Sequence, residues 1–157
     1  MQLYLIRHAH ALDAASDAIR PLSAKGCAQV KRLARFLQRS GLFAPAEIWH
    51  SPLLRAAETA QLLTRHLQSD ATRREVAGLK PEASPRIIAR RLARAPDSLV
   101  LVGHEPNLSA LASLLVAGQT SPPAFEFKKC GVLALERAGA RWVVRWQLSP
   151  ELLARQK

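Results

Sequence analysis

The sequence has few of the residues that mark several common classes of protein. It contains 2 cysteines among 157 residues, Cys27 and Cys130. Two cysteines at this separation suggest neither a disulfide framework nor a metal site. Both are therefore expected to be buried as small apolar side chains in a reduced, cytoplasmic protein. No apolar run approaches the ~20 residues of a membrane helix. No secretory signal is expected either, because Met1 leads directly into a short apolar run that predicts a strand.

Acidic and aromatic residues are also scarce. Asp and Glu total 12 against 23 Lys and Arg, which gives a formal net charge of +11. Such a charge favours acidic partners, whether phosphorylated small molecules, acidic protein surfaces or nucleic acid. Aromatic residues make up only 5% of the chain, which leaves few stacking platforms for nucleic acid. Nucleic acid is therefore disfavoured as a partner. Most basic residues are interpreted as solvated helix faces, because they are spread along the chain.

What the sequence does contain is an alternation of short apolar runs with longer amphipathic segments. Its 48% apolar content and its length are typical of one domain, residues 1–157. Strands are predicted at residues 3–8, 47–50, 98–102, 132–136 and 142–147, with a weaker one at 75–79. Helices are predicted between Ser23 and Gly41, over 53–67, from Ser84-Pro85 onward and over 108–116. Strands separated by helices indicate right-handed crossovers and a mostly parallel sheet. The expected fold is an α/β three-layer α/β/α sandwich, with an antiparallel hairpin at the sheet edge.

Side-chain spacing also predicts which faces are buried. Trp142 and Trp146, four residues apart on a strand, are expected to share one face and pack in the core. Ser84 is expected to cap its helix through its hydroxyl group. The buried stripes of two helices are expected to be Cys27, Val30, Leu33, Ala34 and Leu37 in the first, and Ile87, Ile88, Leu92 and Ala95 in the third.

Three of the predicted strands end in polar side chains. The first strand ends in Arg7-His8, the strand at 47–50 is followed by Ser51 and Arg55, and the strand at 98–102 is followed by His104. In open α/β sheets, ligands bind in the crevice beyond the carboxyl ends of the strands. Two histidines beside two arginines, without a carboxylate or thiolate at ligand spacing, make a poor metal site. The same set suits a phosphoryl group, with two guanidinium forks for its oxygens and a nucleophilic imidazole.

The motifs around these residues resemble those of the histidine phosphatase superfamily, which includes the cofactor-dependent phosphoglycerate mutases. Leu5-Ile6-Arg7-His8-Ala9 resembles its RHG signature, and the stretches 51–60 and 102–106 resemble its second and third motifs. The small size of the chain and its Arg20-Pro21-Leu22-Ser23 segment are most similar to the branch of SixA-type phosphohistidine phosphatases. The resemblance covers roughly residues 1–147 and implies a phosphoglycerate mutase-like fold.

The resemblance also implies a role for each matched residue. His8 would be the nucleophile and would form a phosphohistidine intermediate, which water would hydrolyse to release inorganic phosphate. Arg7 and Arg55 would bind the phosphoryl oxygens, and His104 would contact the same group and stabilise the transition state. Ser51 is either a turn residue or a further phosphate contact. No metal or other cofactor is expected.

Two positions depart from the superfamily pattern. Ala9 replaces the usual glycine, which is tolerable if the backbone there has a negative φ angle. No general acid is evident. Glu75 and Glu82 lie in the matching stretch without a surrounding motif, and Glu105 beside His104 is an open candidate. The imidazole of a phosphohistidine leaves phosphorus more easily than an alkoxide does, because imidazole protonates near neutral pH. The expected substrate is therefore a phosphohistidine-bearing protein.

The sequence also allows other functions and other positions for some side chains. The protein could instead hydrolyse small phosphomonoesters, or bind a phosphoprotein or nucleic acid without turnover. Mutase activity is disfavoured, because no lid is apparent to retain the intermediate. His10 either lines the pocket or lies at the surface. Lys128 and Lys129 either guard the pocket or are solvated.

Overall fold

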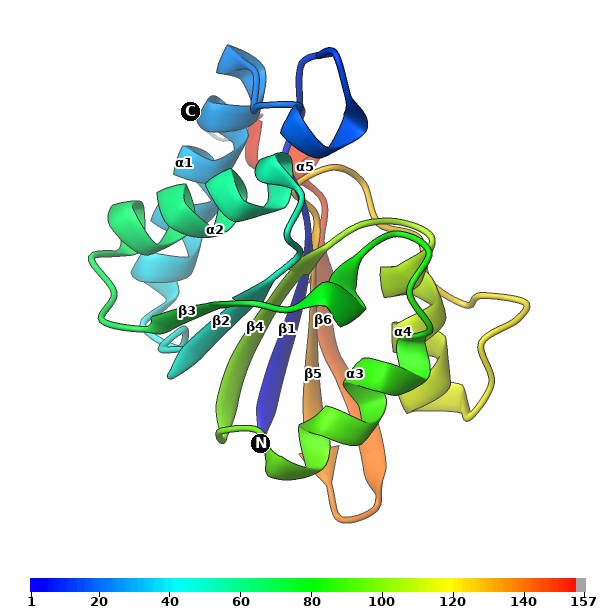
Figure 1. The fold of residues 1–157 in the computed structure, drawn as a ribbon. Coiled ribbons are helices and arrows are strands. Elements are labelled where there is room, and N and C mark those ends of the chain that lie inside the picture. Colours follow the sequence, from blue (N-terminus) through cyan, green and yellow to red (C-terminus); the bar gives the residue numbers. More distant parts are fainter. Residues whose placement is uncertain (155–157) are drawn as a thin grey trace.

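The computed structural model describes residues 1–154 of the chain. Figure 1 shows strands and helices alternating along most of it. The strands are β1 (Gln2–Arg7), β2 (Glu47–His50), β3 (Thr72–Glu75), β4 (Ser98–Gly103), β5 (Val132–Ala138) and β6 (Arg141–Leu148). The α-helices are α1 (Ala24–Ser40), α2 (Leu54–Leu67), α3 (Pro85–Arg91), α4 (Asn107–Ala117) and α5 (Pro150–Ala154). Short 3₁₀ turns lie at Asp17–Ile19, Ala77–Leu79 and Leu92–Arg94.

The strands form one mixed sheet in the order β3-β2-β4-β1-β5-β6. The strands β1 to β4 run parallel to one another, while β5 is antiparallel to both of its neighbours, β1 and β6. The predicted α/β sandwich with an antiparallel edge hairpin is therefore confirmed. Because β5 runs against β1, the segment that enters β5 lies at the same sheet edge as the end of β1. That reversal places residues 127–131 beside the carboxyl end of the first strand.

Helices cover both faces of this sheet (Figure 1). Alternate residues of the central strands point to opposite faces, so Ile6 and Leu5 belong to different cores. Helices α1, α2 and α5 pack on the face of Ile6, and α3 and α4 pack on the face of Leu5. Strands buried on both faces read as the continuous apolar runs seen in the sequence.

Two strand predictions need correction. The third strand is Thr72–Glu75, and the expected strand 75–79 is instead a 3₁₀ turn over Ala77–Leu79. All four residues of β3 are exposed, so this edge strand carries no apolar signal. Trp142 and Trp146 do not share a face, because a register shift between β5 and β6 places them against opposite cores. A bulge adds one residue and reverses the alternation beyond it.

The helix faces also differ from expectation at single positions. Cys27 is exposed and Gly26 takes its place on the buried stripe of α1, whereas Cys130 is buried as expected. In α3, Ile88 is buried but Ile87 is 45% exposed. Ser84 precedes α3 without capping it through its side chain. The change in α1 is a shift of one residue, within the tolerance of a stripe wider than a single row.

Gly26 permits a close approach that any side chain would block. A Cβ atom there would clash with the backbone carbonyl oxygen of His10, which accepts hydrogen bonds from Ser23. Gly26→Ala should therefore lower the free energy of unfolding by about 2 kcal/mol, typical of overpacking. The midpoint of thermal unfolding should fall by roughly 4–8 °C. Cys27→Ala, at the neighbouring exposed position, should leave the midpoint nearly unchanged; equal midpoints for the two variants would contradict the clash.

No helix in residues 1–154 has the length and apolarity that a membrane crossing requires. The cytoplasmic location expected from the sequence stays a prediction. Both cysteines are free thiols.

Candidate active site

Three strand ends bring the predicted residues together. Arg7 ends β1 and is followed by His8, while His104 follows β4. The register pairs Arg7 with Gly103, so the two histidines leave the sheet at the same level. Their ring centroids are 5.0 Å apart. Arg55 lies in the first turn of α2, just beyond the end of β2, and is 5% exposed.

The backbone around His8 is held on two sides. Its N–H donates to the carbonyl oxygen of Gly103 at 3.0 Å. The N–H of Cys130 donates to the carbonyl oxygens of Arg7 and His8, at 3.0 and 3.1 Å. Cys130 makes these contacts with a φ of 60°, in the left-handed region that non-glycine residues seldom adopt. The segment before β5 therefore fixes the position of His8 from the side opposite β4.

The His8 ring presents one nitrogen lone pair. Its Nδ1 lies 2.7 Å from the carbonyl oxygen of Ala9. Because a carbonyl oxygen only accepts, Nδ1 carries the proton and Nε2 keeps its lone pair. Burial, together with the charges of Arg55, Arg7 and Lys129, lowers the pKa of His8 to about 4, although the Ala9 contact opposes this shift. The imidazole is therefore neutral at pH 7, the form that can act as a nucleophile.

The ring of His104 is buried without a partner in the described part of the chain. Within residues 1–154, neither ring nitrogen has a hydrogen-bond partner, although the residue is only 2% exposed. Burial first, and then the neighbouring His8 and Arg55, lower the pKa of His104 to about 3. A buried neutral imidazole has one N–H to donate, and leaving it unpaired is unfavourable. The ring is thus available to hydrogen-bond a bound group.

The two arginines are anchored at their tips. Arg7 Nη1 donates to the carbonyl oxygen of Phe127 at 2.8 Å. Arg55 Nη1 and Nη2 donate to the carbonyl oxygen and to Oδ2 of Asp17, at 2.9 and 3.2 Å. The Nε atoms of both arginines are buried and have no partner in the described part of the chain. Unpaired buried donors are uncommon in proteins, so their gathering here, with His104, indicates a site for an anion.

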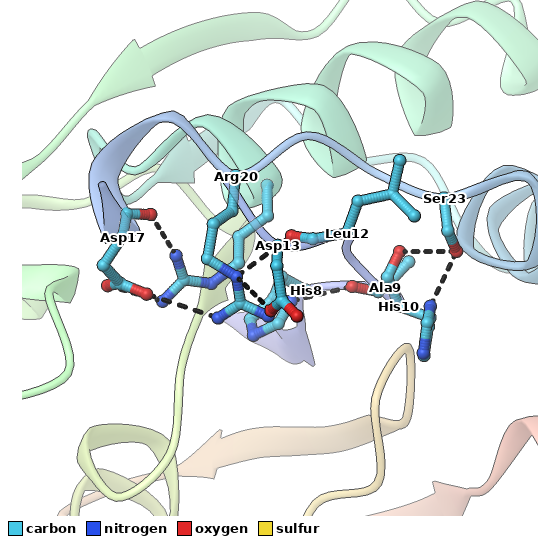
Figure 2. Close-up of polar contacts among 9 residues, drawn as sticks. His8, Ala9, His10, Leu12, Asp13, Asp17, Arg20 and Ser23 are labelled. Atoms are coloured by element: carbon cyan, nitrogen blue, oxygen red, sulfur yellow. Dashed lines mark hydrogen bonds and ion pairs between the residues drawn. The ribbon is translucent and has the colours of Figure 1, made fainter. Parts of the chain in front are cut away.

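Asp17 is a site residue that the sequence reasoning missed. It begins the 3₁₀ turn in the loop after β1, where its carboxylate also pairs with Arg20 at 3.3 Å. Figure 2 shows the polar contacts of this loop, including those of Arg20 with Asp17 and with the Leu12 carbonyl. Desolvation opposes the shift, but hydrogen bonds from Arg55 and Arg20 lower the pKa of Asp17. No local motif surrounds Asp17, so only the folded loop reveals its contact with Arg55.

Thr59 connects two of the motifs and was also missed. Its Oγ1 accepts from the N–H of Ala9 at 3.1 Å and donates to the carbonyl oxygen of Arg55 at 2.7 Å. Ala9 is fully buried and is not among the residues with a positive φ, so alanine fits the usual glycine position without strain. The backbone at position 9 therefore has the negative φ angle that alanine was expected to require there.

The remaining candidates take structural positions or stay untested. Ser51 is fully buried, and its Oγ accepts from the N–H of Leu53 in the turn that enters α2. A phosphate contact by Ser51 stays a prediction. Glu105 accepts from both the N–H and the hydroxyl group of Ser109 in the first turn of α4. Glu75 and Glu82 are exposed. None of these carboxylates contacts the two histidines in the interactions of residues 1–154.

His10 lies beside the site and is held by α1. Its N–H donates to Gln29 Oε1 at 2.9 Å, and its Nδ1 lies 2.7 Å from Ser23 Oγ, a contact visible in Figure 2. It lines a surface cavity together with Arg7, Lys128 and Lys129. That His10, Lys128 and Lys129 line the phosphoryl pocket itself stays a prediction. Residues 1–154 contain no group of three or more His, Cys, Asp or Glu side chains placed to hold a metal ion.

The chain has relatives that match it over most of its length. An uncharacterized protein of Picosynechococcus sp. is 38% identical over 90% of this chain and 88% of that protein. The phosphohistidine phosphatase SixA of Escherichia coli is 28% identical over 96% of this chain and 94% of its own length.

Solved structures show the same fold. The protein histidine phosphatase SixA in complex with tungstate matches with a TM-score of 0.87 and 26% identity, over 98% of this chain and 99% of the other. The α-ribazole phosphatase of Shigella flexneri shares the fold at a TM-score of 0.76 and 17% identity, over 96% and 97% of the two chains. A family model described as histidine phosphatase superfamily (branch 1) matches residues 3–80, which include the first two motifs. The chain therefore belongs to the histidine phosphatase superfamily.

Proposed function

We propose that this phosphatase hydrolyses phosphohistidine in a protein, through a covalent phosphohistidine intermediate on His8, with no metal ion or other cofactor. The observation that carries the proposal is the pairing of a neutral His8, with its Nε2 lone pair available, and buried unpaired donors on Arg7, Arg55 and His104. A nucleophile beside fixed positive charge is the arrangement that phosphoryl transfer needs most.

The reaction takes place in two displacements at phosphorus. His8 Nε2 attacks the phosphoryl group while Arg7, Arg55 and His104 bind its oxygens. The bond between phosphorus and the substrate imidazole breaks, and the leaving nitrogen takes a proton from solvent. Water then attacks phosphorus, releases inorganic phosphate and restores His8 with its lone pair. The anchors at Phe127 and Asp17 keep both guanidinium groups in place, so little reorganisation accompanies the charge movement.

Among residues 1–154, no carboxylate is hydrogen-bonded to His8 or His104, which supports an imidazole leaving group. Asp17 is the carboxylate bonded to Arg55, and its lowered pKa keeps it ionised at neutral pH. An ionised carboxylate cannot donate the proton that an alkoxide leaving group requires. Imidazole accepts a proton from water near pH 7 and needs no such donor. The similarity to the phosphohistidine phosphatase SixA of Escherichia coli, and to the solved structure of a SixA protein histidine phosphatase, supports the same substrate class.

A small phosphomonoester is the second candidate substrate. The α-ribazole phosphatase of Shigella flexneri has the same fold, so this architecture also holds phosphatases named for small molecules. The same nucleophile and phosphate-binding groups would serve both reactions, and only the leaving group would differ.

Turnover of two substrates in parallel separates these candidates. A phosphohistidine peptide and an aryl phosphate should be compared with the same preparation, with and without a metal chelator. We expect kcat/KM to be higher for the peptide by at least ~10-fold, the scale on which leaving-group fit discriminates substrates. The chelator should change neither rate. Faster hydrolysis of the aryl phosphate would assign the protein to small phosphoesters, and loss of both activities with the chelator would contradict a metal-independent reaction.

A further inference from the structure

A basic cavity adjoins the phosphoryl site. It has a volume of about 390 Å³ and shares Arg7 with the site and His10 with the loop that follows β1. Its lining also contains four lysine or arginine side chains, which are Lys25, Arg32, Lys128 and Lys129. The mechanism proposed above uses none of these four.

Three separate parts of the fold build this cavity. Lys25, Gln29 and Arg32 project from one face of α1, since positions i, i+4 and i+7 align on a helix. The segment before β5 supplies Lys128 and Lys129, and α5 closes the far side with Pro150, Glu151 and Ala154. Segments distant in sequence thus contribute cations to one place, which a solvated helix face alone does not explain.

The cavity has an excess of positive charge. Glu151 is the one carboxylate in its lining. Lys128 lies 3.9 Å from Glu126, but in residues 1–154 Lys25, Arg32 and Lys129 form no salt bridge. Burial, followed by the charges of Arg7, Arg20, Lys25 and Arg55, lowers the pKa of Lys129. Cations gathered in this way repel one another, and a bound anion relieves the repulsion.

We propose that this cavity binds carboxylate side chains that neighbour the phosphohistidine of the substrate protein, so that acidic segments are preferred. The inference rests on the proposed function. The phosphoryl site holds its anion with buried guanidinium groups in fixed positions, whereas Lys25, Arg32 and Lys128 are exposed and carried on long stems. Mobile exposed cations suit several carboxylates at variable positions better than one phosphate of defined geometry.

Two phosphohistidine peptides of equal length test the preference. In one peptide the phosphohistidine is flanked by glutamates, and in the other by glutamines. At low ionic strength, we expect kcat/KM to be about tenfold higher for the acidic peptide, because steering by complementary charge acts mainly on association. The difference should narrow as salt is added, since exposed charges are screened.

A charge-reversed variant connects the preference to the cavity. In Lys25→Glu/Arg32→Glu, the preference for the acidic peptide should disappear or reverse. Lys31→Glu/Arg35→Glu is the matched control, because it makes the same change of charge at exposed positions of α1 outside the cavity. The control variant should still prefer the acidic peptide. If net charge alone caused the loss, both double variants would lose the preference.

The possible failures are distinguishable. Equal kcat/KM for both peptides in the wild type, or a preference lost equally in both double variants, would overturn the cavity's role and leave the proposed function standing. A higher kcat/KM for a small molecule with two phosphates than for the acidic peptide would assign the cavity to another ligand and overturn the inference. Failure of the wild type to dephosphorylate either peptide would overturn the proposed function, and this inference with it.

Discussion

Replacing His8 by alanine should lower kcat by at least about 10⁴-fold, the scale of losing a covalent nucleophile. His104, whose ring is centred 5.0 Å away, follows a different strand and is assigned to binding the phosphoryl group rather than to attack. Steady-state turnover of a phosphohistidine peptide measures the loss. The unfolding midpoint should be recorded beside it, because His8 is buried and its replacement also changes packing.

A second measurement identifies the intermediate itself. Rapid acid-free quenching with a ³²P-labelled substrate should label the wild type at about one site per molecule. The label should survive alkali and be lost in acid, as expected of a phosphorus–nitrogen bond. His8→Ala should carry no label, whereas His66→Ala, a histidine substitution in α2, should label like the wild type. A labelled His8→Ala protein would assign the nucleophile to another residue.

The coming together of the four candidate residues was predictable from local sequence. Each of them lies at or just beyond the end of a short apolar strand, and parallel strands bring their ends to one edge; the four are Arg7, His8, Arg55 and His104. That rule requires only the order of the strands along the chain, which the pattern of apolar residues predicts. The groups that anchor these residues were not predictable in this way. Asp17 reaches Arg55 across 38 positions of sequence, a contact that no periodicity encodes.

The errors in the fold prediction have a similar origin. Gly26 replaces Cys27 on the buried face of α1 because the carbonyl group of His10 approaches the helix there. The two tryptophans of β6 separate because one extra residue in the ladder changes their faces. β3 carries no apolar residue, so it is held in the sheet by backbone pairing with β2 and by the ion pair of Arg74 with Glu47. Each of these features is set by a tertiary contact, which a single stretch of sequence does not contain.

Arg55→Lys should lower kcat/KM by roughly 10²–10³-fold, the scale of losing a transition-state donor. The substitution keeps the charge but removes the fork. Arg55 uses Nη1 and Nη2 to hold Asp17 and keeps a buried Nε unpaired, so its donors serve two purposes at once. A lysine has one donor nitrogen and cannot contact Asp17 and a phosphoryl oxygen in the same geometry. Arg65→Lys, at an exposed position of the same helix, is the matched control.

The division of the loss between kcat and KM separates two roles for Arg55. If its Nε donor binds the phosphoryl oxygens more tightly as charge develops in the transition state, most of the loss falls on kcat. Inhibition by inorganic phosphate then weakens by a smaller factor than kcat falls. Asp17→Asn then provides the complementary comparison, because it leaves Arg55 in place and removes only the charge that anchors it. A loss in Asp17→Asn about as large as that in Arg55→Lys would mean that orientation of the guanidinium group, rather than its presence, determines the rate. Full activity of Arg55→Lys would contradict the assignment, because a single point charge would then be sufficient at this position.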